Sequence, residues 1–166
     1  SLSIFFSLAS QKTLKSFADA IHKVFHHSGS LIIFHTLPTA AFNVIRGHLS
    51  ASSDFLIVEI GGEITDVLLS HRGIIEEVTS FPLGENFLYR GISTRFATLP
   101  KEAISLARSY LEGVLSDKEK LNLVQAVDHV KIEWLKSFKK VLELSSLEYL
   151  LPSKCFILAN ASAGAF

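Results

Sequence analysis

Two adjacent glycines between two apolar segments are the feature of this sequence with the clearest chemical potential. Residues 55–66 read FLIVEIGGEITD, with Glu59 before the glycines Gly61 and Gly62. Because glycine has no Cβ, the backbone of such a turn can approach a phosphate closely, and its N–H groups can hold an anion. A carboxylate beside the turn could order a hydrated Mg²⁺. The segment therefore indicates a site for a phosphorylated ligand and a metal ion, although a plain β-hairpin has the same pattern.

The segments around this turn alternate between strand and helix patterns. Short apolar runs predict strands at residues 3–9, 31–34, 55–60, 64–71, 74–80 and 155–159. Apolar residues at helical spacing predict helices at residues 11–27, 39–46, 84–97, 101–115 and 117–144, the last as one helix or two. This order is typical of an α/β fold, so we expect a mixed five-stranded sheet with helices on both faces.

The expected sheet has a defined arrangement. Its centre is formed by residues 3–9, 55–60 and 64–71, and residues 31–34 and 155–159 extend it in parallel through right-handed crossovers. Residues 84–151 should pack as a helical layer, with Trp134 largely buried.

Composition narrows the possible functions. The chain has 166 residues, 48% of them hydrophobic, which suffices for one core. Equal numbers of basic and acidic residues, 16 each, give no overall attraction to nucleic acid, so we expect no nucleic-acid partner. The single cysteine, Cys155, excludes a disulfide framework, and within an apolar strand we expect a buried thiol. The apolar runs are too short to span a membrane. Because the chain begins with Ser1 and has no methionine, we expect a piece of a longer protein.

Four segments together resemble the actin-like ATPase superfamily. Residues 58–66 resemble its second phosphate motif, strand-D-[IL]-G-G-G-T-T-D-strand, without a gap. Residues 35–41, HTLPTAA, are similar to the E-P-x-A-A step before that motif. Residues 81–86, FPLGEN, resemble the glycine-glycine-Asp/Asn entry to the helical subdomain, and residues 155–163, CFILANASA, resemble the closing segment beside adenosine. The short helical insertion and the P-L-G-x-N-F entry look most like FtsA and PilM, which serve bacterial cell division and type IV pilus assembly.

The resemblance implies a ribonuclease-H-like fold. Residues 1–166 would form one lobe, the C-terminal lobe of a two-lobed ATPase, with residues 84–151 as a helical insertion. It further implies the missing N-terminal lobe and protein partners in a membrane-associated assembly, with self-association as another possibility. The expected location is cytoplasmic, peripheral to the inner membrane through partners.

The resemblance also implies a site for ATP and Mg²⁺. Glu59 would order the metal and the attacking water, and the backbone of Gly61 and Gly62 would hold phosphate oxygens. Thr65 and Asp66 would support the turn. The remaining residues implied to contact the nucleotide are Glu63, Gly84, Glu85, Asn86, Asn160, Ala161 and Ser162.

The sequence departs from the family pattern at several of these positions. Glu59 stands in place of the leading Asp, Glu63 in place of the third glycine, and Glu85 in place of the second glycine of the helix entry. Asn160, Ala161 and Ser162 replace the final glycines. A carboxylate at position 63 would repel a triphosphate, and its side chain would hinder the approach of the backbone. Three functions stay open: a weak or lost ATPase in an assembly protein, a non-enzymatic scaffold, and a sugar or acetate kinase lobe.

Overall fold

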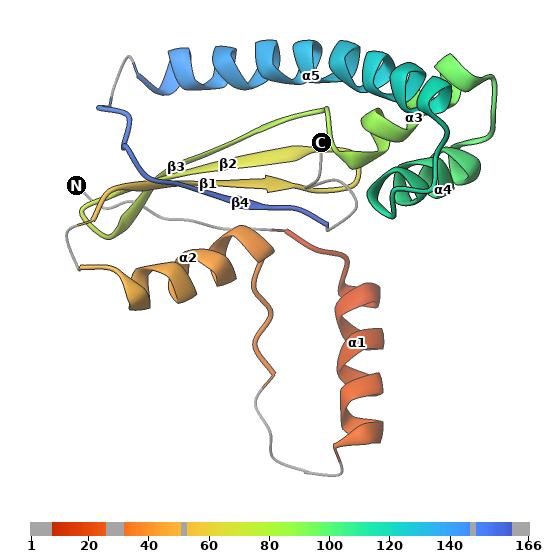
Figure 1. Cartoon of the computed structure of the whole chain (residues 1–166). Coiled ribbons are helices and arrows are strands. Elements are labelled where there is room, and N and C mark those ends of the chain that lie inside the picture. The colour runs from red at the N-terminus through yellow and green to blue at the C-terminus, as the bar shows by residue number, and fades with distance from the viewer. Residues whose placement is uncertain (1–7, 26–31, 51–52, 147–148, 161–166) are drawn as a thin grey trace.

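The chain forms a mixed sheet with helices on both faces. The computed structural model describes residues 8–25, 32–50, 53–146 and 149–160 (Figure 1). Their elements are α1 (Gln11–Val24), α2 (Leu37–His48), β1 (Phe55–Ile60), β2 (Thr65–His71), β3 (Ile74–Phe81), α3 (Glu85–Phe96), α4 (Pro100–Leu111), α5 (Asp117–Ser145) and β4 (Cys155–Leu158). No helix in these ranges is long and apolar enough to cross a membrane.

The sheet confirms the predicted three-stranded meander and the parallel last strand. Its strand order is β3-β2-β1-β4, in which β1, β2 and β3 are antiparallel neighbours and β4 runs parallel to β1. A turn at Arg72 and Gly73, both with positive φ, joins β2 to β3. The mixed sheet and the parallel pairing of the last strand are therefore as predicted.

The predicted number of strands is not found. The described residues contain four strands, and most of the predicted strand 3–9 lies outside them. The strand predicted at 31–34 is wrong in its described part, because Ile32, Ile33 and Phe34 adopt no regular structure. Phe34 instead lines a shallow hollow beside Leu14 of α1. An apolar run alone does not show whether sheet or helix is its neighbour.

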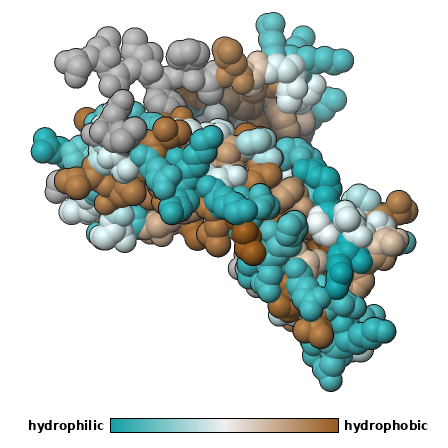
Figure 2. Space-filling view, turned by 90° about the horizontal axis from the view of Figure 1, so that it is seen from above, coloured by the Kyte–Doolittle hydropathy of each residue, from teal (hydrophilic) through white to brown (hydrophobic). Residues whose placement is uncertain are grey.

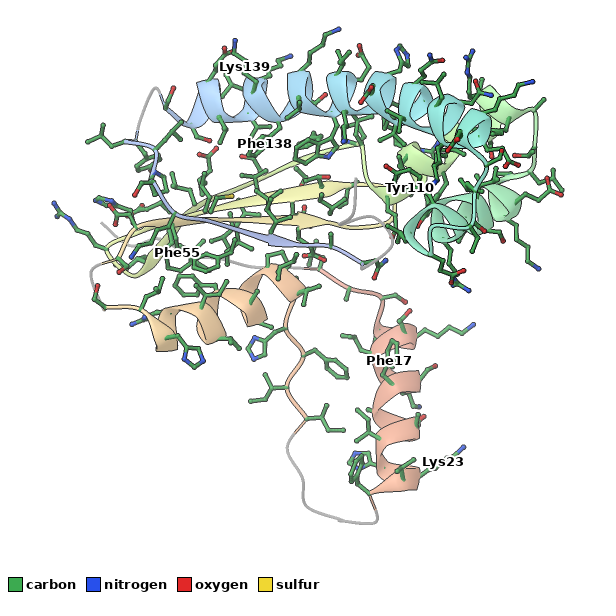
Figure 3. The ribbon with its side chains drawn as sticks, viewed as in Figure 1. Phe17, Lys23, Phe55, Tyr110, Phe138 and Lys139 are labelled. Atoms are coloured by element: carbon green, nitrogen blue, oxygen red, sulfur yellow. The ribbon has the colours of Figure 1, made fainter. Side chains whose placement is uncertain are left out.

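Helices cover both faces of the sheet, as predicted. Figure 3 shows Phe55 of β1 between the sheet and α2, and Phe138 of α5 pointing toward the opposite face. Phe55 packs with Phe42 of α2, whereas Leu56, the next residue of β1, packs on the α5 side. Successive side chains of a strand point to opposite faces, so an apolar run such as β1 is buried on both sides.

The stretch predicted to be helical has a core of its own. Side chains of α3, α4 and the first half of α5 form this cluster: Leu88, Tyr89, Ile92, Ala103, Ala107, Leu123, Ala126, Val127 and Val130. Ser116 and Glu119 form a capping box at the start of α5, which continues as a single helix of 29 residues. The division of the chain into a lobe with an insertion at 84–151 stays a prediction.

Two expectations about exposure need correction. Trp134 is only partly buried, although it stacks on Phe138 at 5.1 Å and meets Phe81 edge-on at 5.5 Å between ring centroids. Cys155 is exposed rather than buried, because α5 does not cover β4 at the edge of the described sheet. Figure 2 shows the molecule from above the view of Figure 1. Hydrophobic and hydrophilic residues are intermixed on the face that it displays.

Two helical glycines provide a matched test of this packing. A Cβ at Gly91 in α3 would lie 2.4 Å from Cγ2 of Val130 in α5, whereas nothing lies within 4 Å of a Cβ at Gly47 in α2. We expect Gly91→Ala to lower the free energy of unfolding by about 1–3 kcal/mol. Gly47→Ala should raise it by about 0.5–1 kcal/mol, since alanine favours helix. Urea unfolding measures both values. Val130→Ala should be less damaging in the Gly91→Ala background than alone; equal damage in both backgrounds would exclude the contact as the cause.

Candidate functional site

The turn between β1 and β2 is bonded through its carbonyl groups to the start of α3. The backbone N–H of Glu85 donates to the carbonyl of Gly61, and the N–H of Asn86 donates to that of Gly62, both at 2.8 Å. The first N–H groups of a helix have no partner inside the helix and commonly bind anions. Here the turn supplies partners for two of them, so fewer N–H groups at the start of α3 are free to bind an anion.

Gly84 makes this contact possible. A Cβ on Gly84 would lie 2.4 Å from the carbonyl oxygen of Gly61 and 2.6 Å from that of Gly62. Real side chains do not approach backbone atoms so closely, so only glycine fits at this position. The structure thus brings together the predicted site residues at 61–62 and at 84–86, which are separate in the sequence.

Glu63 is exposed but engaged with α3. Its carboxylate accepts a hydrogen bond from Nδ2 of Asn86 at 2.8 Å and pairs with Nη1 of Arg90 at 3.0 Å. The hydrogen bonds from Asn86 and Arg90 lower the pKa of Glu63, so it is ionised at neutral pH. Arg90 was not identified from the sequence. Its spacing of four residues from Asn86, which places both on one face of α3, is the signal that could have identified it.

Glu85 is a buried carboxylate that connects α3 to the end of β4. It accepts hydrogen bonds from the hydroxyl of Tyr89 and from Nδ2 of Asn160. The structure therefore joins two segments that the resemblance assigned to the nucleotide. The remaining predicted residues of the second segment, Ala161 and Ser162, lie outside the described part of the chain. Tyr89 was another residue that the sequence did not single out.

Thr65 is fully buried and its hydroxyl is used within the protein. Its Oγ1 donates to the carbonyl of Leu83 at 2.7 Å and accepts from Nε1 of Trp134 at 3.1 Å. This hydroxyl therefore links β2, the segment leading into α3, and the middle of α5. It holds the surroundings of the turn in place.

Two carboxylates face each other where β1 ends and β2 begins. Glu59 and Asp66 are direct cross-strand partners on the sheet face covered by α2. Asp66 accepts a hydrogen bond from the hydroxyl of Ser80. The Oε2 atom of Glu59 is buried and has no hydrogen-bond partner among the described residues. Burial, and secondly the charge of Asp66, raise the pKa of Glu59.

This pair has the donor chemistry of a magnesium site, but it is incomplete. Carboxylate oxygens are the ligands that Mg²⁺ prefers, and the unpaired buried oxygen of Glu59 is available to one. The described residues hold no group of three or more acidic, histidine or cysteine side chains that could bind a metal. Mg²⁺ usually keeps several waters and binds through one or two carboxylates together with phosphates. Glu59 and Asp66 therefore fit a hydrated cation that arrives with a phosphorylated ligand.

An apolar pocket of about 370 Å³ opens beside the turn, on the α5 side of the sheet. Its lining comes from the ends of β1 and β4, the start of α3 and the middle of α5: Ile60, Gly84, Glu85, Phe87, Leu88, Val127, Val130, Lys131, Trp134, Leu135, Ile157 and Ala159. Small-molecule sites are commonly apolar hollows with a few polar groups. Glu85 and Lys131 are the charged members of this lining, and Trp134 supplies an aromatic wall.

The raised pKa of Glu59 should make the stability of the folded chain depend on pH. A carboxyl group whose pKa is raised by folding stabilises the native state below its unfolded pKa, and that stabilisation is lost as the pH rises through the folded pKa. Glu59→Gln removes this titration, so its stability relative to the unmodified chain should increase between pH 4 and pH 7. Urea unfolding at both pH values measures this change.

The exposed Glu112 offers a matched control. Glu112→Gln removes the same charge without relieving a buried carboxylate, so its relative stability should change little between the two pH values. A Glu59→Gln variant with the same pH response as Glu112→Gln would contradict the assignment.

No protein-family model matches this sequence, and neither does any curated protein. Among solved structures, PilM in the PilM–PilN type IV pilus biogenesis complex is similar, with a TM-score of 0.66 and 18% identity over 90% of this chain and 42% of that one. The ethanolamine utilization protein EutJ from Carboxydothermus hydrogenoformans is similar with a TM-score of 0.50 and 19% identity, over 63% of this chain and 35% of that one. The chain thus spans less than half the length of either protein. It has the fold of one lobe of an actin-like ATPase, related in structure to PilM.

Proposed function

We propose that this chain acts as the C-terminal lobe of an assembly protein of the FtsA and PilM type, and that it supplies only half of an ATP site. The observation that carries the proposal is the bonding of the Gly61–Gly62 turn to α3. That bonding holds the two glycines against the start of α3, and their carbonyl groups are occupied by the protein itself. The likeness to PilM, whose solved complex contains the partner PilN, supports a role in a protein assembly.

The residues of this lobe divide the proposed nucleotide contacts between two faces of the sheet. The apolar pocket with Trp134 suits a planar base on the α5 side. Glu59 and Asp66 suit a hydrated Mg²⁺ on the α2 side. Bound ATP would supply the free energy for closure of two lobes against each other. The chain itself orients the base and the metal.

The isolated chain should bind Mg-ATP with a dissociation constant no tighter than about 1 mM, or ~4 kcal/mol. One lobe holds the triphosphate charge from one side only, and Glu63 adds a negative charge at the turn. Glu63→Gly removes that charge and releases Arg90, so this variant should bind several-fold more tightly. Calorimetric titration measures both constants.

A second substitution isolates the role of Arg90. In Glu63→Gly/Arg90→Gln the gain should disappear, because the released cation is gone. Micromolar binding by the unmodified chain would show that the turn is open to phosphate and that the protein is a working ATPase. Binding that is equally weak in all three proteins would favour the non-enzymatic scaffold.

The assembly role has a separate test in cells. Proximity labelling with this chain as bait, in the organism that carries it, should mark inner-membrane components of a pilus or division machine. A chain with Trp134→Ala, in which the bond to Thr65 is lost, controls for labelling that depends on an intact fold. Labelling confined to metabolic enzymes would contradict an assembly role and would favour the kinase alternative.

A further inference from the structure

A second hollow, of about 550 Å³, lies between α3 and the first half of α5, which pack against each other (Figure 1). We call it the α3–α5 groove. It shares Phe87 and Val130 with the pocket beside the turn, but it contains neither Glu85 nor Trp134. The polar side chains of its lining are all exposed, and they come from both helices: Arg90, Thr94, Arg95, Gln125 and His129.

Small residues form the floor of the α3–α5 groove. They are Gly91 of α3 together with Ala126 and Val130 of α5. A Cβ at Gly91 would lie 2.4 Å from Cγ2 of Val130, so the two helices approach closely at this point. The longer polar side chains therefore stand around a short apolar floor. The volume of the groove is in the range of small-molecule sites.

The charge of the groove is one-sided, although the chain as a whole has 16 basic and 16 acidic residues. Two arginines and a histidine belong to its lining, and none of the described residues that line it is acidic. Glu133, one turn after His129 on α5, is paired with Lys136 at 2.7 Å. The pocket beside the turn differs, because its lining includes the carboxylate of Glu85. The groove therefore favours an anionic ligand.

Protein contacts hold both guanidinium groups in position. Nη2 of Arg95 donates to Oε1 of Gln125 at 2.8 Å, which links α3 to α5. Nη1 of Arg90 pairs with Glu63 at 3.0 Å. A guanidinium carries N–H donors on three nitrogens, so each arginine keeps donors for a ligand. Holding a long side chain in place lowers the entropic cost of binding.

The spacing of the arginines indicates a ligand with two anionic groups. Arg90 and Arg95 are five residues apart, which places them about 7.5 Å apart along the axis of α3. Arginine recognises phosphate through paired hydrogen bonds, more specifically than lysine does. The apolar floor at Gly91 can contact the carbon atoms that join two phosphates.

We propose that the α3–α5 groove binds a small molecule that carries two phosphate groups, one held by Arg90 and the other by Arg95 with His129. This site goes beyond the proposed Mg-ATP contacts, since it lies on other residues of α3 and α5. It is connected to the Gly61–Gly62 turn through Arg90 alone. A phosphate bound to Arg90 competes with Glu63 for that guanidinium.

The test is calorimetric titration of the whole chain without Mg²⁺ or nucleotide. Fructose 1,6-bisphosphate and pyrophosphate serve as probes. Fructose 6-phosphate, which has the same skeleton with one phosphate, should bind about tenfold more weakly than the bisphosphate, the effect of one lost charged contact. Arg95→Gln should weaken binding of the bisphosphate by a similar factor and leave the urea midpoint unchanged, because Arg95 is exposed. Arg108→Gln makes the same charge change on the exposed side of α4 and should leave binding unchanged.

A double-mutant cycle tests the competition for Arg90. Glu63→Gln removes the carboxylate that occupies this guanidinium, so the variant should bind fructose 1,6-bisphosphate several-fold more tightly. In Glu63→Gln/Arg90→Gln that gain should be absent. A gain that persists without Arg90 would show a general charge effect and would contradict the competition.

Several results would overturn the proposal. They are no binding of either probe, equal binding of fructose 6-phosphate and the bisphosphate, and an equal loss in Arg108→Gln and Arg95→Gln. Binding that Arg95→Gln leaves unchanged would place the anion at the turn. Hexaglutamate that binds as tightly as the bisphosphate would indicate an acidic peptide instead. Flotation with cardiolipin vesicles in the absence of soluble binding would indicate a lipid. These titrations contain no Mg-ATP, so their failure is distinguishable from a failure of the proposed function.

Discussion

The contact between Gly84 and the carbonyl groups of Gly61 and Gly62 determines where the helical part of the molecule begins. Because a Cβ at position 84 would lie 2.4 Å from a carbonyl oxygen, only glycine can occupy this position. The start of α3 is thereby fixed against the end of the sheet. The direction of α3 then sets the crossing with α5 at Gly91 and Val130, and α5 returns along the sheet far enough for Trp134 to reach Thr65.

Glu63 and Glu85, which stand where the resembled motifs have glycine, both serve this junction. Glu63 bonds to the exposed side of α3 through Asn86 and Arg90, and Glu85 bonds on the buried side to Tyr89 and Asn160. A negative charge in the first turn of a helix is also favoured by the helix dipole. Glu63, which disfavours a triphosphate, therefore acts together with Glu85 to hold the turn, α3 and β4 in place. Restoring a glycine at either place would exchange stability of the junction for access of a ligand.

Sequence patterns predicted the parts of the fold that depend on local periodicity and turn chemistry. The β1–β2–β3 meander, the position of β4 and both helix-covered faces follow from apolar runs and glycine turns. The strand predicted at 31–34 failed in its described part, where Phe34 lies beside α1 instead of in the described sheet. The pairing of Glu63 with Arg90 and the exposure of Cys155 depend on tertiary arrangement, respectively the orientation of α3 and the edge position of β4. The exposure of Cys155 leaves no periodic signal in the sequence, and the spacing of Asn86 and Arg90 indicates only that they share a face of α3.

Alternation along β1 places the two halves of the candidate site on opposite faces of the sheet. Glu59 faces α2, and its neighbour Ile60 lines the pocket on the α5 side. One ligand can contact both only by crossing the end of the β1–β2 hairpin, where Gly61 and Gly62 offer the smallest obstacle. Such a ligand would lie along the edge of this lobe with much of its surface uncovered. A second lobe is the structural element that could cover that surface.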